Sequence, residues 1–244
     1  MKKILFVVNL DKFFISHRLP IALEAKKAGY EIHIATKFTT QKNLFYGFDF
    51  FLHRLPIERS SLNLGSNLKT LFAIYNLYKK IRPDICHLIT IKPILYGSFC
   101  AYFFKNLSLV ISITGLGYIF SNRGLFSSFK KIIISIMYKY AFNHKRIRLI
   151  FQNRDDRAKL IKITKFSKKD TVLIPGSGVD LDEFCPQIEK ETNIVLFASR
   201  LLVSKGIKDF IEASKYVRNA RFIVCGRFDF DNPDYVNENY IYQS

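Results

Sequence analysis

The 244-residue sequence contains none of the short motifs that mark the commonest cofactor and nucleophile sites. It has no GxGxxG fingerprint for a dinucleotide, no GxxxxGK[ST] phosphate loop and no GxSxG nucleophile turn. Its four cysteines form no CxxC pair, and its five histidines are isolated along the chain. The sequence therefore argues against a dinucleotide site, and local spacing assembles no metal-ligand cluster.

Long hydrophobic runs are also missing. Lys105 and Asn106 interrupt the longest candidate, so no stretch of about 18 apolar residues is available to span a bilayer. The amino-terminal run MKKILFVVNL is too short for a signal peptide, since Asp11 follows and no small-residue cleavage site appears. We expect a cytoplasmic protein with reduced thiols, in which Cys86 and Cys225 are small core residues and any membrane contact is peripheral.

Acidic residues are scarce, and this gives the chain a net charge of +18. Between Arg123 and Lys169 there are fourteen Lys or Arg against Asp155 and Asp156 alone, so most of the excess lies there. Such a segment attracts phosphates, an anionic membrane surface or nucleic acid. A solvated basic surface explains the same composition, and the sequence leaves these alternatives open.

Apolar segments alternate with helical patterns along the chain. The run from Ile4 to Val8 predicts a strand that is buried on both faces. A helix is expected from near Ser16 to Ala28, with Ser16 as its N-cap and Pro20 in its first turn. Further strands are expected at 30–35, 48–55, 84–89, 109–114, 147–152 and 171–174, and further helices at 68–81, 94–104, 129–142 and 155–163. This order predicts an α/β fold with a Rossmann-like, doubly wound sheet.

The pattern pauses after residue 175 and then restarts. Residues 176–192 are rich in Gly, Pro and acidic residues, as in an interdomain connection. A strand at 194–198, a helix at 205–217 and a strand at 221–225 follow, while 227–244 shows no clear element. We expect a first domain at 1–180, a connector at 181–192 and a partial second domain at 193–244. One βαβ unit cannot cover its own sheet, so we also expect a truncated chain.

Two cations mark the turn after the first strand of the second domain. Arg200 follows that strand directly, and Lys205 precedes Gly206 at the start of the next helix. A bidentate Arg and a Lys beside helix N–H groups favour a phosphate or diphosphate. A solvated helix start is the alternative.

Three more candidates lie where strands of the first domain are expected to end, the usual ligand edge of an open α/β sheet. In the loop from Asn9 to Arg18, backbone N–H groups and Arg18 could receive an anion, and His17 could act as a base or donor. In the TGLG turn, Gly115 and Gly117 permit close approach of a ligand, although a tight turn explains them equally well. In PGSGVD, Gly176 serves either a ligand or a hinge.

These residues resemble a known family. The segments FISHRLPIALEAKKAGYEIHIAT, SITGLGYIF, PGSGVDLDEF and SRLLVSKGIKDFIEA look like those of a retaining glycosyltransferase of the GT4 (group 1) family. The likeness is greatest to the bacterial branch that adds sugars to polyprenyl-diphosphate-linked glycans for O-antigen, capsule or protein glycosylation. It extends from Met1 to about Gly226, and RLxxxKG is its most specific motif.

The resemblance implies a GT-B fold with two Rossmann-like domains and an active site between them. It implies a nucleotide-sugar donor, expected to be a UDP-sugar, a lipid-linked glycan acceptor, and basic helices on the anionic inner face of the plasma membrane. No metal, cofactor or nucleic acid is implied. The implied site residues are Arg200, Lys205 and Gly176 for the donor, His17 for catalysis, and Phe14, Ser16, Arg18, Gly115 and Gly117 for the acceptor.

Two departures from the family pattern matter. The TGLG loop lacks the His that members often carry, and no acidic E-x7-E segment follows Cys225. If the chain ends at Ser244, we expect transferase activity to be absent or severely reduced. The alternatives are a non-catalytic remnant or a basic module that binds nucleic acid or membranes.

Overall fold

The computed structural model describes residues 1–39, 42–58, 63–116, 125–186, 192–230, 232 and 234–242. The chain divides into two compact units, which we call unit 1 (Met1–Gly178) and unit 2 (Val179–Ser244). In the described parts of the chain, no helix combines the length and the hydrophobicity needed to cross a bilayer.

Unit 1 is a seven-stranded sheet in the order β3-β2-β1-β4-β5-β6-β7, and every neighbouring pair is parallel. Its strands are β1 (Lys3–Leu10), β2 (Glu31–Lys37), β3 (Phe51–Arg54), β4 (Ile85–Ile89), β5 (Ser108–Ile113), β6 (Ile147–Phe151) and β7 (Thr171–Leu173). Its helices are α1 (Asp11–Lys27), α2 (Leu64–Ile81), α3 (Ile91–Ala101), α5 (Leu125–Ala141) and α6 (Arg154–Thr164), with short 3-10 turns η1 (Lys42–Phe45) and η2 (Lys168–Asp170). The predicted doubly wound α/β architecture is confirmed.

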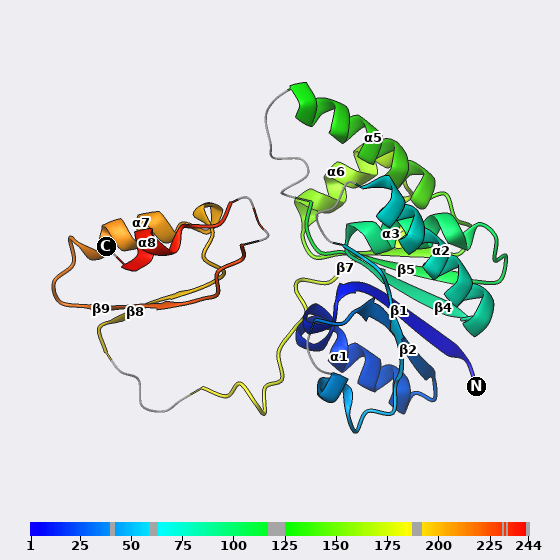
Figure 1. Ribbon diagram of the computed structural model, residues 1–244, viewed down its shortest axis with the longest axis horizontal. Helices are drawn as coiled ribbons and strands as arrows, with labels where there is room; N and C mark the ends of the chain where they lie inside the picture. The colour runs from blue at the N-terminus through cyan, green and yellow to red at the C-terminus, as the bar shows by residue number, and fades with distance from the viewer. Residues whose placement is uncertain are drawn as a thin grey trace. The chain divides into compact units, whose positions relative to one another are not determined.

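Helices cover the two faces of this sheet unequally. α1 packs on one face, where Phe6, Ile34 and Phe14 form a small core with η1. α2, α3, α5 and α6 lie on the other face and cover a larger core (Figure 1). From β1 the chain adds β2 and β3 on one side of the sheet, and it then adds β4 to β7 on the other side. The strand order therefore reverses between β1 and β4. This reversal is the topological switch point of the sheet.

The first helix begins earlier than expected. α1 begins at Asp11, so Ser16 lies inside the helix and is not its N-cap. The Ser16 hydroxyl instead donates to the carbonyl of Lys12 at 2.8 Å. Pro20 also lies within the helix, where it removes one backbone hydrogen bond. The other strands and helices expected in unit 1 are present, with ends that shift by up to four residues.

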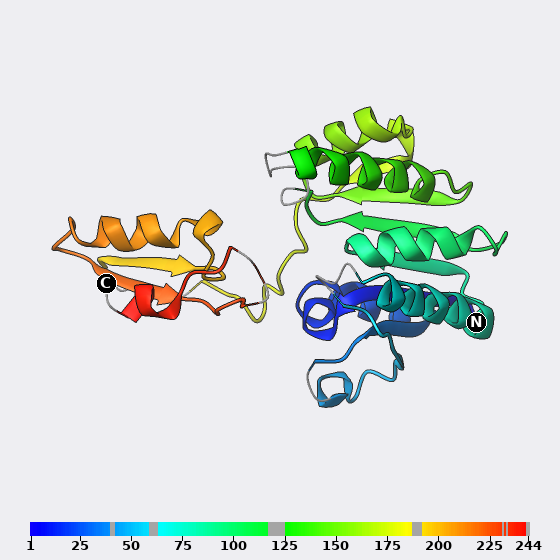
Figure 2. The same cartoon turned by 45° about the horizontal axis from the view of Figure 1, so that its top comes forward.

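Among the residues of unit 2 that the structure describes, one parallel pair is formed by β8 (Ile194–Ala198) and β9 (Arg221–Cys225). Its helices are η3 (Val203–Lys205), α7 (Ile207–Ser214) and α8 (Glu238–Tyr242). Figure 2 shows the arrowheads of β8 and β9 pointing the same way, as parallel strands must. A small core gathers Leu201, Ile207, Ile211 and Val236.

Three details of unit 2 differ from expectation. The helix expected at 205–217 is divided, because Gly206 takes a left-handed conformation (φ 79°) between η3 and α7. The tail expected to lack structure contains α8. Cys225 is exposed, whereas Cys86 is buried as expected. A lone βαβ unit leaves part of its sheet uncovered, and the 57% exposure of Leu196 shows the same effect.

Close packing of α3 on β4 depends on Gly97. A Cβ atom built on Gly97 would lie 2.5 Å from Cδ2 of Leu88 and 2.9 Å from the hydroxyl oxygen of Tyr78. Leu88 and Tyr78 are both fully buried. The neighbouring Ser98 is also fully buried, and its Oγ has no hydrogen-bond partner.

We therefore expect Gly97→Ala and Ser98→Ala to have opposite effects. Gly97→Ala should lower the free energy of unfolding by about 1–3 kcal/mol, because the core has no room for the methyl group. Ser98→Ala should be neutral or stabilising, because it removes an unsatisfied buried hydroxyl. Urea unfolding followed by circular dichroism measures both. Equal stability of Gly97→Ala and the parent protein would contradict the packing described for α3.

Candidate functional site

The carboxyl ends of β1 and β4 meet at the switch point of unit 1. Val7 pairs with Leu88 in the parallel register, and Asn9 near the end of β1 and Thr90 directly after β4 lie at the same edge of the sheet. Ligands of open α/β sheets bind at such an edge. α1 begins directly after β1 and brings Ser16, His17 and Arg18 into its second turn (Figure 1).

The amino terminus of α1 is already occupied by a carboxylate. The Asp11 side chain is fully buried and accepts hydrogen bonds from the backbone N–H of Lys12 at 2.8 Å and of Thr39 at 2.9 Å. The Thr39 hydroxyl donates to the same carboxylate at 2.6 Å. The expectation that backbone N–H groups here receive a ligand anion is therefore corrected, because Asp11 already supplies negative charge to this helix end.

His17 is exposed and has one nitrogen engaged. Its Nδ1 lies 2.6 Å from Ser16 Oγ, which itself donates to the Lys12 carbonyl. The Ser16 proton is thus used, so the hydrogen-bond pattern assigns a proton to Nδ1 and leaves the lone pair of Nε2 as an acceptor. The ring stacks on Phe13 with centroids 4.4 Å apart. Burial and the nearby charge of Arg18 lower the pKa of His17, which favours the neutral ring.

Arg18 is a buried cation with only 4% of its surface exposed. Its Nη1 donates to the His17 carbonyl at 3.0 Å and to Ser177 Oγ at 3.1 Å. Ser177 lies in the turn after β7, between Gly176 (φ 76°) and Gly178 (φ 74°). That turn requires glycine for its left-handed backbone, and it brings residues from opposite ends of unit 1 together at Arg18.

The other predicted site residues of unit 1 differ in exposure. Gly115 has φ 146° and open space around its Cα, so a ligand has access to its backbone. Gly117 lies outside the described residues. Phe14 is fully buried and packs edge-on against Phe6 at 5.6 Å. Its ring has no exposed surface to offer an acceptor, so its place is in the core beneath the site.

Unit 2 carries the two predicted phosphate ligands. Arg200 follows β8 and forms an ion pair with Asp229, with Nη1 at 2.6 Å from Oδ2. The Arg200 side chain is 48% exposed. Lys205 ends η3, directly before Gly206. The Arg200 guanidinium is the exposed side of this ion pair, since the Asp229 side chain is only 16% exposed, so an incoming phosphate can reach Arg200 from the solvent.

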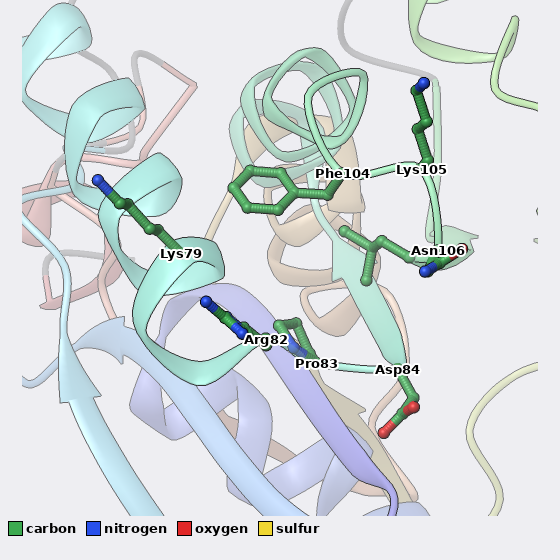
Figure 3. A pocket seen from close by; sticks show the side chains of 8 residues that line it. Lys79, Arg82, Pro83, Asp84, Phe104, Lys105 and Asn106 are labelled. Carbon is green, nitrogen blue, oxygen red and sulfur yellow. The ribbon is translucent and has the colours of Figure 1, made fainter.

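Two surface pockets lie away from the switch point. One of about 380 Å³ lies at the amino ends of β4 and β5, where Lys79, Arg82 and Lys105 surround an apolar floor (Figure 3). The other, of about 640 Å³, lies beside the carboxyl ends of α5 and α6 and includes Lys139 and Lys165. Both lie at the opposite edge from the expected ligand site. In the described part of the chain, no group of three metal-binding side chains is found.

Four relevant residues were not predicted as site residues: Asn9, Asp11, Thr90 and Ser177. Asn9 and Asp11 lay within the predicted loop, but their roles depend on contacts with distant segments. Thr90 has an unusual positive φ of 70°, which cannot be predicted from its residue type. Ser177 contacts a residue 159 positions away.

A doubly wound parallel unit followed by a second βαβ unit agrees with the GT-B fold that the resemblance implied. Comparison with known families makes this specific. Residues 3–153 match the family described as "Glycosyl transferase 4-like". The match covers more than half of the chain, and the chain therefore belongs to this family.

Two curated relatives have named activities. The N,N'-diacetylbacillosaminyl-diphospho-undecaprenol alpha-1,3-N-acetylgalactosaminyltransferase of Campylobacter jejuni is 25% identical over 90% of this chain and 64% of its own length. The UDP-Gal:alpha-D-GlcNAc-diphosphoundecaprenol alpha-1,3-galactosyltransferase of Escherichia coli is 28% identical over 67% of this chain and 44% of its own length. The chain thus spans less than two thirds of the length of either relative.

Solved structures support the fold at lower identity. Sucrose-phosphate synthase from Thermosynechococcus elongatus matches all of this chain and 67% of its own, with a TM-score of 0.77 and 16% identity. A glycosyltransferase from Rickettsia africae matches 91% of this chain and 59% of its own, with a TM-score of 0.63 and 21% identity. At these identities the likeness shows the fold alone.

Proposed function

We propose that the protein is a glycosyltransferase that transfers a sugar from a UDP-sugar to a glycan linked to a lipid diphosphate. The observation that carries this proposal is the family match, together with two relatives whose names both specify a diphosphoundecaprenol-linked acceptor. The name of one relative also specifies a UDP-linked donor. The basic surface of the chain, with its net charge of +18, suits substrates of this kind.

In this proposal unit 2 binds the donor. Arg200 offers a bidentate guanidinium and Lys205 a point charge to the diphosphate of the UDP-sugar, and both neutralise charge as UDP leaves. Gly176, in the turn after β7, has open space around its Cα and is proposed to approach the donor through its backbone. None of these steps requires a metal ion.

Unit 1 binds the acceptor and supplies the base. Ser16, Arg18, Gly115 and Gly117 contact the acceptor, and buried Phe14 supports α1 beneath them. The acceptor hydroxyl oxygen approaches the anomeric carbon of the donor sugar on the face that the diphosphate leaves, and it bonds to that carbon as the bond to the diphosphate breaks. UDP leaves with the electron pair, and Nε2 of His17 takes the hydroxyl proton. The anomeric configuration of the donor is retained.

An apolar surface on α5 and α3 suits the membrane on which a lipid-linked acceptor resides. The helix α5 is rich in apolar residues, and it exposes the side chains of Ile132, Ile136 and Tyr140. The Tyr102 hydroxyl, just after α3, donates to the Tyr140 carbonyl and brings the two helices side by side. Exposed apolar side chains next to lysines are typical of peripheral membrane contact.

Donor binding is tested by titrating the full chain with UDP in a calorimeter. Arg200→Ala and Lys205→Ala should each weaken binding about 10–100-fold, the range expected for losing a hydrogen bond to a charged group. Arg218→Ala removes the same charge from an exposed site in unit 2 and should leave the affinity within about twofold. If the parent protein shows no detectable UDP binding, the intact donor site is refuted.

The role of His17 is tested by sugar transfer. The probes are UDP-N-acetylgalactosamine and UDP-galactose, with undecaprenyl-diphosphate-linked N-acetylglucosamine as acceptor. His17→Gln should lower kcat about 100-fold or more with little change in KM, as for a lost general base.

The pH profile of transfer gives a second measure of His17. A base must be neutral to accept a proton, and the pKa of His17 is lowered from 6.5. The acid limb of the kcat profile should therefore lie below pH 6.5. His144→Gln, a substitution in the turn before β6, is the control. Unchanged kcat in His17→Gln would exclude the base role, and no transfer by the parent chain would favour a non-catalytic binding module.

Membrane contact is tested by sedimentation with phospholipid vesicles. The protein should bind vesicles that contain phosphatidylglycerol better than neutral phosphatidylcholine vesicles, and added salt should weaken binding. Ile136→Asp should abolish sedimentation, because it places a charge on the apolar face of α5. Leu68→Asp changes an equally exposed apolar residue on α2 and should bind as the parent does. Equal binding by Ile136→Asp and the parent would exclude α5 as the contact.

A further inference from the structure

Several residues at the switch point of unit 1 have buried polar atoms that lack a hydrogen-bond partner. The described part of the chain has five buried side-chain polar atoms without a hydrogen-bond partner. Three of them, Asn9 Oδ1, Arg18 Nε and Thr90 Oγ1, belong to the carboxyl edge formed by β1, β4 and α1. Most buried polar groups in folded proteins are hydrogen-bonded, so three unmet groups at one edge indicate an absent partner.

Arg18 makes the strongest demand for a partner. The two acceptors of its Nη1, the His17 carbonyl and Ser177 Oγ, are neutral. Within the described residues, no carboxylate lies at ion-pair distance from its guanidinium. Asp11 lies two turns earlier on the same face of α1, but its oxygens accept from Lys12 and Thr39. A buried cation without a counter-charge is costly, and an anionic ligand would remove that cost.

The buried histidine of β4, His87, does not compensate the positive charge of Arg18. His87 of β4 is buried, and its Nε2 lies 2.8 Å from Ser112 Oγ. Burial, with a smaller contribution from the charge of Arg18, lowers the pKa of His87 to about 3. His87 is therefore neutral near pH 7 and contributes no charge.

Thr90 adds strain at the same place. It follows β4 with φ 70° and ψ 160°, a conformation that β-branched residues rarely adopt. Such a residue costs on the order of 1–3 kcal/mol and commonly marks a functional site. The strained backbone holds a buried hydroxyl, without a partner of its own, at the same edge of the sheet as Asn9.

We propose that Arg18, Thr90 and Asn9 form the site for the diphosphate that joins the acceptor glycan to its lipid. This assignment rests on the proposed function. Arg18 offers N–H donors from Nε and its outer nitrogens to phosphate oxygens, and Thr90 offers a hydroxyl. Asn9 Oδ1 accepts from a hydroxyl of the adjoining sugar. The acceptor is chosen over the donor because Arg18 lies next to Ser16 and His17, which the proposed function places at the acceptor, whereas Arg200 and Lys205 serve the diphosphate of the donor.

A purely structural role for Arg18 makes a different prediction. Its hydrogen bond to Ser177 anchors the turn after β7 to α1. If that anchoring were its purpose, Arg18→Met should lower the melting temperature. If Arg18 instead serves to bind an anionic ligand, Arg18→Met should leave the melting temperature unchanged or raise it. The reason is that replacing an unpaired buried charge with an apolar side chain is often stabilising.

The deciding experiment titrates the full chain with farnesyl diphosphate, inorganic diphosphate and UDP. Arg18→Met should weaken the binding of farnesyl diphosphate and of inorganic diphosphate at least tenfold. Its affinity for UDP should stay within about twofold of that of the parent protein. Arg146→Met removes an exposed guanidinium near the amino end of β6 and should change none of the three affinities. An equal loss for UDP would assign the site to the donor diphosphate and overturn the acceptor assignment.

Thr90→Val provides a second variant that keeps the β-branched shape. Thr90→Val should weaken the binding of farnesyl diphosphate at least threefold without lowering the melting temperature. The proposal is overturned if both variants bind farnesyl diphosphate as the parent does, or if Arg18→Met lowers the melting temperature and Thr90→Val has no effect on binding. Farnesyl diphosphate binding without any sugar transfer would refute the proposed transferase function and leave this site intact.

Discussion

The parallel pairing of β1 with β4 is the constraint on which the site of unit 1 depends. These strands are separated by β2, β3 and the helices α1 and α2 in sequence, yet they are neighbours in the sheet. Parallel strands end at one edge, and the chain leaves β1 toward one face and β4 toward the other. Asn9 and Thr90 thereby lie at the same edge of the sheet, although 81 positions separate them, and α1, which carries Arg18, begins there as well.

Asp11 determines how that edge is used. A helix terminus after β1 would ordinarily be the place for a ligand anion. Here the Asp11 carboxylate is buried there and is held by Thr39 from the segment after β2. Positive charge is instead presented by a side chain of the second turn, Arg18. In the proposed site of unit 1, a guanidinium that packing fixes therefore takes the place of a row of backbone N–H groups.

The sequence was sufficient for the architecture and for the location of the ligand edge, because both follow from local periodicity. Apolar runs identified β1 and β4, and glycines identified the turns after β5 and β7. The start of α1 was wrong because Ser16 looked like a cap, while the contact of Asp11 with Thr39 spans 28 positions. The pairing of Arg200 with Asp229 and of Arg18 with Ser177 was not predicted, because each depends on long-range folding. Composition and spacing carry no information of that kind.

The two arginines differ in a way that suits different ligands. Arg200 is half exposed and paired with Asp229, so it is balanced without a ligand and can exchange its partner. Arg18 is buried against neutral acceptors, so its charge is balanced only when an anion arrives. A leaving diphosphate must be released after each transfer, which suits the exchangeable pair. A diphosphate that anchors the acceptor throughout the reaction suits the buried guanidinium, because a desolvated charge holds an anion more strongly than an exposed one does.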